Sequence, residues 1–280
     1  MGSAVSSGNV ERYKIAGLLL LLLLAVAPAA LLLKYVLLRD KYKREPMQLI
    51  GITFLLGALG IIPATIIELL LGFGNILITA FLSVAVVEET MKYLAVRAKA
   101  YNSPNFNEVM DGIVYGVAAG LGFATAENIF YVLGFGTIST ALIRAFMSVP
   151  SHAAYGGIMG FYLGMAKPFC LTSKQDQRKL ILTGLAIAIL LHGLYDTIAF
   201  SLEGFAGLAG LLVMTAISWI ILLRLIKKAL SLSPIRWGDI SPQPVTYQTY
   251  PNRFCTQCGF QRESGSRFCT NCGEGFDQAI

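Results

Sequence analysis

The chain has 280 residues, of which 55% are hydrophobic and only 14% are charged, and its mean hydropathy is +0.65. This composition is too apolar for a single soluble domain. Most of the basic residues lie in short segments between apolar stretches, so the net charge of +6 is a topology signal and not an indication of nucleic-acid binding. Composition therefore predicts an all-α polytopic membrane protein.

Seven apolar segments of spanning length follow a polar N-terminal tail, residues 1–14. We expect membrane helices over Ile15–Leu33, Leu49–Leu71, Ile76–Val96, Met110–Leu133, Ile138–Met165, Leu180–Leu202 and Leu208–Leu225. Pro63 should kink the second helix, and Pro150 should break or kink the fifth. The predicted transmembrane domain covers residues 15–232.

Basic residues follow the first, third, fifth and seventh apolar segments, whereas the loops after the second, fourth and sixth contain none. The positive-inside rule then places the N-terminus outside and the C-terminus in the cytoplasm. Arg12 and Lys14 oppose this orientation, but five basic residues follow the first span. We expect an integral, multi-pass protein of the cell membrane with a cytoplasmic C-terminus.

Two Cys-x-x-Cys pairs lie beyond a proline-containing linker, residues 233–253. The pairs are Cys255 with Cys258 and Cys269 with Cys272, and each is followed by glycine. Four cysteines at this spacing are typical of a structural zinc ribbon, which we expect over residues 254–275. The ribbon would suit a cytoplasmic protein partner, because its basic and acidic residues balance and nucleic acid is the weaker choice.

Glu88, Glu89 and Lys92 lie inside the third apolar segment. Each ionised side chain near the centre of a membrane helix costs roughly 2.5–3.5 kcal/mol. Lys92 is one helical turn from both glutamates and can neutralise one of them. The other carboxylate needs a proton, a metal or another partner.

Four more polar side chains lie at overlapping depths in other spans: Glu127, His152, His192 and Asp196. His192 and Asp196 are i,i+4 neighbours, so they can bind one ion or the carboxylate can orient the imidazole. A convergent cluster of this kind suits Zn²⁺ or another divalent ion, with a neighbouring glutamate as general base. The alternative is that each group forms its own interhelical hydrogen bond.

Three patterns in these segments resemble the signature motifs of the PrsW family of intramembrane metalloproteases, a relative of the CAAX prenyl proteases. They are Glu88-Glu89-x-x-Lys92, Phe123-x-x-x-Glu127 and His192-x-x-x-Asp196. They occur in the family's order and on separate helices, and the segment around His152 is similar more loosely. The resemblance covers roughly residues 75–205.

The resemblance implies that Glu88 and Glu89 are catalytic, with Lys92 of the same motif beside them. It assigns a metal-binding or oxyanion-stabilising role to Glu127, His152, His192 and Asp196. In the prenyl-protease relatives, similar groups are argued to activate water without a metal, so both forms stay open.

The predicted function is an intramembrane endopeptidase in which a glutamate activates water to hydrolyse a membrane-tethered protein. By resemblance, the substrate is an anchored protein similar to an anti-sigma factor. An ion- or proton-coupled transporter is the main alternative, but it predicts an inverted repeat, which the sequence lacks. A catalytically inactive scaffold is a third alternative. It predicts that some of the polar site residues are missing, whereas this sequence has all of them.

Overall fold

A computed structural model describes residues 4–71, 74–167 and 173–233 of the chain. The cysteines of the expected zinc ribbon lie outside the described residues, as does the expected linker after Ser233. The ribbon and its zinc therefore stay a prediction. Within the described ranges, all regular secondary structure is helical, as the composition predicts.

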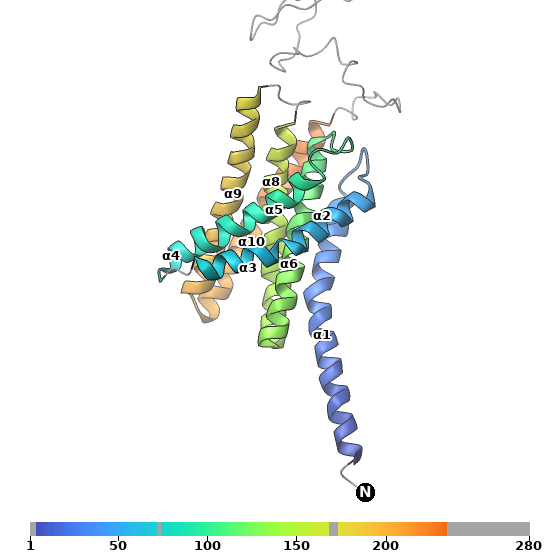
Figure 1. Ribbon diagram of the computed structural model, residues 1–280, viewed down its shortest axis with the longest axis vertical. Helices are drawn as coiled ribbons and strands as arrows, with labels where there is room; N and C mark the ends of the chain where they lie inside the picture. The colour runs from blue at the N-terminus through green and yellow to red at the C-terminus, as the bar shows by residue number, and fades with distance from the viewer. Residues whose placement is uncertain (1–3, 72–73, 168–172, 234–280) are drawn as a thin grey trace, which may run out of the picture.

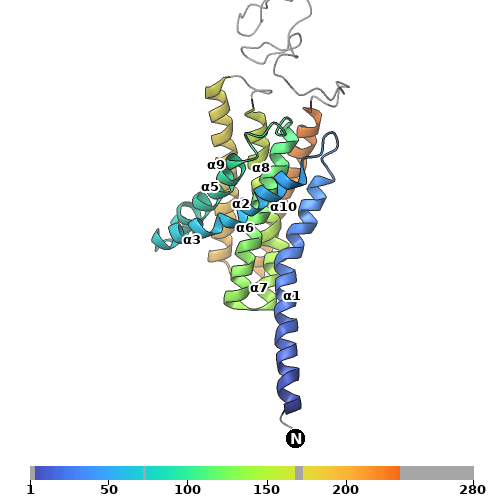
Figure 2. The same cartoon turned by 45° about the vertical axis from the view of Figure 1, so that its right-hand side comes forward.

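The helices form a bundle that is crossed obliquely by two further segments. In chain order the elements are α1 (Ala4–Leu37), α2 (Met47–Leu59), α3 (Ile61–Leu70), α4 (Ile76–Ile78), the π-helix η1 (Thr79–Ala85), α5 (Val86–Ala98), α6 (Val109–Phe135), α7 (Ile138–Ile143), the π-helix η2 (Arg144–Ser148), α8 (Val149–Met165), α9 (Lys174–Ser201) and α10 (Gly204–Ser231). Helices α1, α6, α8, α9 and α10 run roughly along the long axis, while α2–α3 and α4–α5 cross them on one side (Figure 1). The N-terminal part of α1 extends beyond the other helices (Figure 2).

Five stretches of the described chain are long and apolar enough to cross a membrane. They are Lys14–Leu37, Met47–Leu70, Val109–Gly134, Lys174–Ser201 and Gly204–Ser231. The third and fifth predicted spans are instead divided into shorter pieces, α4–η1–α5 and α7–η2–α8. The architecture is that of a multi-pass membrane protein, and the count of seven spans stays a prediction.

Both prolines predicted to disturb a helix coincide with a change in helical winding. Helix α2 ends at Leu59, four residues before Pro63, and α3 begins at Ile61. Proline clashes with the carbonyl of the residue four positions earlier, which accounts for the break at that point. Before Pro150 the helix is wound as the π-helix η2, because proline has no N–H for the carbonyl of Phe146.

Helix α6 is the centre of the bundle. In its most apolar window 94% of the residues are buried, against 17% for α1. Glycines on both helices let α8 lie directly against α6, because a Cβ on Gly116 would overlap the carbonyl oxygen of Gly156. A Cβ on Gly120 would overlap the carbonyl oxygen of His152. The contact at Gly120 therefore fixes the position of His152 along α6.

A group of buried acids lies where the loop after α1 meets the start of α6. Asp40, Glu45, Glu108 and Asp111 are all at most 5% exposed, and the Tyr115 hydroxyl donates a hydrogen bond to Glu45. Burial, followed by repulsion from Glu108, raises the pKa of Asp40 to about 6. Burial likewise raises the pKa of Glu45 to about 7. The folded protein therefore keeps protons on these two carboxyls that the unfolded chain releases near pH 4.

We expect the stability of the solubilised protein to fall as the pH rises from about 4 to about 7, because over this range the folded state binds more protons than the unfolded state. A variant with Asp40→Asn and Glu45→Gln should flatten this part of the curve of Tm against pH. Thermal unfolding across the range measures both effects, with Asp176→Asn as an exposed acidic control on α9. An equally steep curve in the double variant would show that other groups cause the dependence.

Candidate active site

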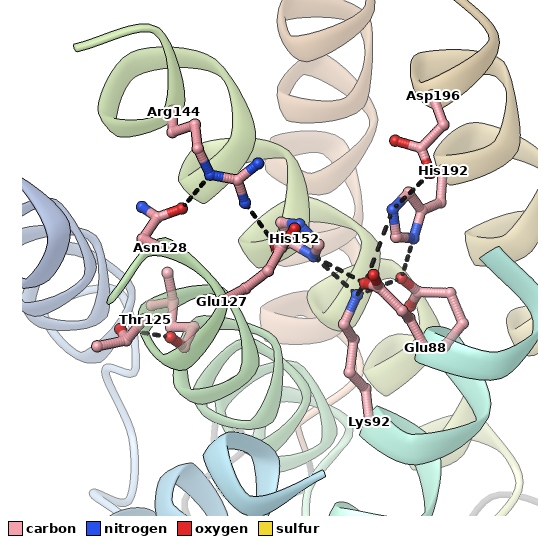
Figure 3. Close-up of polar contacts among 11 residues, drawn as sticks. Glu88, Lys92, Thr125, Glu127, Asn128, Arg144, His152, His192 and Asp196 are labelled. Atoms are coloured by element: carbon pink, nitrogen blue, oxygen red, sulfur yellow. Dashed lines mark hydrogen bonds and ion pairs between the residues drawn. The ribbon is translucent and has the colours of Figure 1, made fainter. Parts of the chain in front are cut away.

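Polar side chains from α5, α6, η2, α8 and α9 meet in one cluster (Figure 3). Glu88 and Glu89 lie in the first turn of α5, directly after η1. The π-helix η1 packs on α9 at Gly193, where a Cβ would overlap the ring of Phe81. The absence of a side chain at Gly193 therefore brings the start of α5 against α9, next to His192.

Lys92 lies in the middle of these groups and is completely buried. Its Nζ is 2.7 Å from Glu89 Oε1 and 3.3 Å from Glu88 Oε2, so Lys92 pairs with both glutamates, whereas neutralisation of one was predicted. The same Nζ lies 2.7 Å from His152 Nδ1 and 4.6 Å from the ring centroid of Phe123. The ammonium group thus balances the two carboxylates and faces an aromatic ring.

Glu88 lies between the two imidazoles. Its Oε2 is 3.9 Å from His152 Nδ1 and also 3.9 Å from His192 Nε2. The ring centroids are 5.0 Å apart at an interplanar angle of 80°. One potential ligand atom from each of the three residues lies within 4.8 Å of the others, and no second group of this kind occurs in the described ranges.

Each imidazole has a carboxylate at the ring nitrogen that does not face Glu88. His192 has a second carboxylate, that of Asp196, at the nitrogen that does face Glu88. His152 Nε2 lies 3.1 Å from Glu127 Oε2, and His192 Nδ1 lies 2.8 Å from Glu89 Oε1. Asp196 Oδ2 lies 3.3 Å from His192 Nε2, which confirms that His192 and Asp196 share a face of α9. Carboxylates in such positions fix the tautomer and orientation of an imidazole.

All seven site residues predicted within the membrane come together in this cluster. They are Glu88, Glu89, Lys92, Glu127, His152, His192 and Asp196. They form one connected network instead of separate interhelical hydrogen bonds. Within it, Glu88 faces both imidazoles, whereas Glu127 and Asp196 each contact one of them.

Two contacts were not predicted in detail. Arg144 Nη2 lies 2.6 Å from Glu127 Oε2, and the ring of Tyr155 stacks on His192 with centroids 5.3 Å apart. Arg144 is the one charged residue of the fifth predicted span, and a charge at that depth requires a partner. The sequence holds no signal for which acid it would be, and Tyr155 is distinguished only by its place three residues after His152.

Glu88, His152 and His192 fit a divalent metal. Two imidazoles and one carboxylate form the protein ligand set of many catalytic zinc sites. Tetrahedral bonds of about 2.0–2.1 Å place ligand atoms about 3.3 Å apart. The three side chains would therefore have to move inward from separations of 3.9 Å for the two pairs with Glu88 and of up to 4.8 Å for the set. Lys92 Nζ would then have to retract from His152 Nδ1.

Comparison with known proteins agrees with this geometry. Residues 45–223 match the family model described as PrsW family intramembrane metalloprotease. The chain is 37% identical over 208 residues to Protease PrsW of Geobacillus kaustophilus (strain HTA426), a match that covers 73% of this chain and 89% of the relative. It is 36% identical over 212 residues to Protease PrsW of Bacillus subtilis (strain 168), which covers 74% of this chain and 94% of the relative.

A third relative, Protease PrsW of Halalkalibacterium halodurans, is 40% identical over 182 residues, which covers 64% of this chain and 82% of that protein. No solved structure matches the chain significantly. The matched region, residues 45–223, includes every member of the intramembrane cluster. The chain therefore belongs to the PrsW family of intramembrane metalloproteases.

Proposed function

We propose that Glu88, His152 and His192 hold the divalent metal of this protease, most simply Zn²⁺, and that Glu89 accepts the proton of the attacking water. The observation that carries the proposal is the arrangement of the imidazoles. Each directs one nitrogen toward Glu88 and has a carboxylate on the other, His152 that of Glu127 and His192 that of Glu89. This is the usual pattern of metal-binding histidines.

The proposed ligand set differs from the expected one, which contained Glu127 and Asp196. Glu127 lies on the ring nitrogen of His152 that is not directed at Glu88. Asp196 Oδ2 lies 3.3 Å from His192 Nε2, the nitrogen that also faces Glu88. We assign Glu127 the role of orienting His152. Asp196 lies beside the proposed ligands, and Glu88 takes the place of Glu127 and Asp196 in the ligand set.

The surrounding residues supply the groups that peptide hydrolysis needs. A bound divalent metal would polarise the scissile carbonyl and lower the pKa of water to about 7. Glu89 Oε1 is held by Lys92 and His192, while its Oε2 is buried with no hydrogen-bond partner in the described ranges. Oε2 is therefore free to accept the proton of water and to return it to the leaving amine. The buried ammonium of Lys92, 3.3 Å from Glu88 Oε2, would stabilise negative charge that develops on the substrate beside the metal.

The same buried groups would suit an ion- or proton-coupled transporter. The family match does not favour that alternative, because it covers the helices that carry the cluster and describes a metalloprotease. Hydrolysis within the bilayer is the function that the chemistry of the cluster and the family have in common.

The substrate that suits this site is a membrane-tethered protein, since the polar cluster is enclosed by helices with apolar outer faces. The resemblance to the family suggests an anchored protein similar to an anti-sigma factor. We place the enzyme in the cell membrane with its C-terminus in the cytoplasm. There the ribbon would bind its own zinc and a protein partner.

Glu89→Gln tests the proton-transfer role separately from metal binding. Glutamine keeps an oxygen for His192 but cannot accept a proton, so we expect cleavage to fall by about 10²–10⁴-fold while the metal content at saturating zinc stays that of the wild type. The assay uses single-span reporter proteins reconstituted in liposomes with the full chain, and Asp176→Asn is the matched control. Cleavage by Glu89→Gln at the wild-type rate would remove Glu89 from the mechanism.

A further inference from the structure

We propose that Arg144 is a positioning residue of the protease, which holds Glu127, and through it His152, in the orientation needed to bind the metal. The inference rests on the proposed function of the cluster. Arg144 lies outside the three motifs and is the first residue of η2. The sequence around Arg144 does not link this residue to the metal site. The link is its contact with Glu127 in the structure.

A single oxygen joins Arg144 to the histidine. Glu127 Oε2 lies 2.6 Å from Arg144 Nη2 and 3.1 Å from His152 Nε2. The three side chains form a row that ends at His152, whose other nitrogen is directed at Glu88 (Figure 3). A displacement of Arg144 would therefore change the group that fixes the ring of His152.

The guanidinium is itself held firmly by α6. Its Nε donates a hydrogen bond of 2.7 Å to Asn128 Oδ1, and its Cζ lies 3.8 Å from the ring centroid of Tyr131. Asn128 and Tyr131 are on the same helix as Glu127. A planar guanidinium can satisfy an ion pair, a hydrogen bond and a stacking contact together, which an ammonium cannot do with the same geometry.

The ion pair between Arg144 and Glu127 is largely buried, so the loss of one partner should affect the other strongly. The side chains of Arg144 and Glu127 are each only 15% exposed, and Glu127 lies on a helix that is long and apolar enough to cross a membrane. Removal of one partner of a buried ion pair leaves an uncompensated charge. Glu127 would then turn toward another cation or take up a proton, and His152 would lose the acceptor that orients it.

The test is zinc titration of the metal-depleted full chain with Arg144→Gln, combined with steady-state cleavage of a reporter. We expect about a tenfold loss of affinity at the intramembrane site, a lower kcat and a KM within twofold of the wild-type value. Arg144→Lys should recover part of the loss because it keeps the charge. Any zinc bound by the ribbon is common to all variants and cancels in the comparison.

The matched control is Arg97→Gln. Arg97 also lies over a tyrosine, with its Cζ 4.4 Å from the ring centroid of Tyr101, but in the last turn of α5. We expect wild-type zinc affinity for this variant. We also expect the double variant Glu127→Gln, Arg144→Gln to bind zinc no more weakly than Glu127→Gln alone, since Arg144 acts through Glu127.

Two results would overturn the role of Arg144. One is an Arg144→Gln protein with the zinc affinity of Arg97→Gln, even if its Tm is lower, because the arginine would then be only structural. The other is a double variant in which the two single losses multiply. Either result leaves the proposed function intact as long as His152→Ala loses the metal, whereas retention of that metal in His152→Ala would refute the site itself.

Discussion

His152→Ala and His192→Ala should each lose one metal ion per chain and should cleave a membrane-tethered reporter at least about a thousandfold more slowly than the wild type. Several kcal/mol of transition-state stabilisation depend on a catalytic metal, and about 4 kcal/mol corresponds to a thousandfold change in rate. Each imidazole has a nitrogen 3.9 Å from Glu88 Oε2, so removal of either ring leaves only two of the three ligands. Metal content by mass spectrometry and initial rates on one preparation measure both effects.

The contrast with Glu89→Gln separates ligands from the proton acceptor. The histidine variants lose metal and activity together, whereas Glu89→Gln loses activity alone. Wild-type metal content in both histidine variants, together with loss of cleavage, would favour the metal-free form, in which the imidazoles stabilise an oxyanion. Full activity in either variant would exclude that histidine from the mechanism.

Gly116→Ala should prevent α6 and α8 from packing and should destabilise the protein by at least about 2 kcal/mol. The new Cβ would overlap the carbonyl oxygen of Gly156, and a backbone atom cannot swing aside as a flexible side chain can. Because the next contact along α6, between Gly120 and the carbonyl oxygen of His152, depends on the same close approach of the helices, we also expect any protein that still folds to bind its metal poorly. Thermal unfolding and the yield of monodisperse protein measure the first effect, and metal content measures the second.

Gly51→Ala is the matched control. Gly51 is a helical glycine of α2 at which a Cβ would meet nothing within 4 Å. Alanine in place of glycine in a helix stabilises by about 0.5–1 kcal/mol, so this variant should be as stable as the wild type or slightly more so. Equal behaviour of Gly51→Ala and Gly116→Ala would show that the close helix contact does not control stability.

The helical architecture and the convergence of the polar groups could be predicted from the sequence. Ionised side chains are too costly in lipid to remain apart, and Lys92 is the obvious neutralising partner for a glutamate one turn away. The kinks at Pro63 and Pro150 follow from proline geometry alone. These inferences need only local spacing and the cost of burying charge.

The division of roles within the cluster could not be predicted. Which side chain faces another helix depends on helix rotation, and η1 and η2 change that rotation just before Glu88 and Val149, with no signal in the spacing of apolar residues. The partner of Arg144 was also open, because several acids lie at similar depths. Only the direction of the Arg144 side chain toward α6 selects Glu127.

X-ray absorption at the edge of the bound metal, recorded on the full chain and on His152→Ala, tests the intramembrane metal site most directly. The wild-type spectrum should contain nitrogen and oxygen ligands at about 2.0–2.1 Å, which are distinct from any cysteine sulfur of the ribbon at about 2.3 Å. His152→Ala should lose this nitrogen and oxygen contribution and keep any sulfur. A wild-type spectrum with sulfur ligands alone, unchanged in His152→Ala, would contradict a metal held by Glu88, His152 and His192.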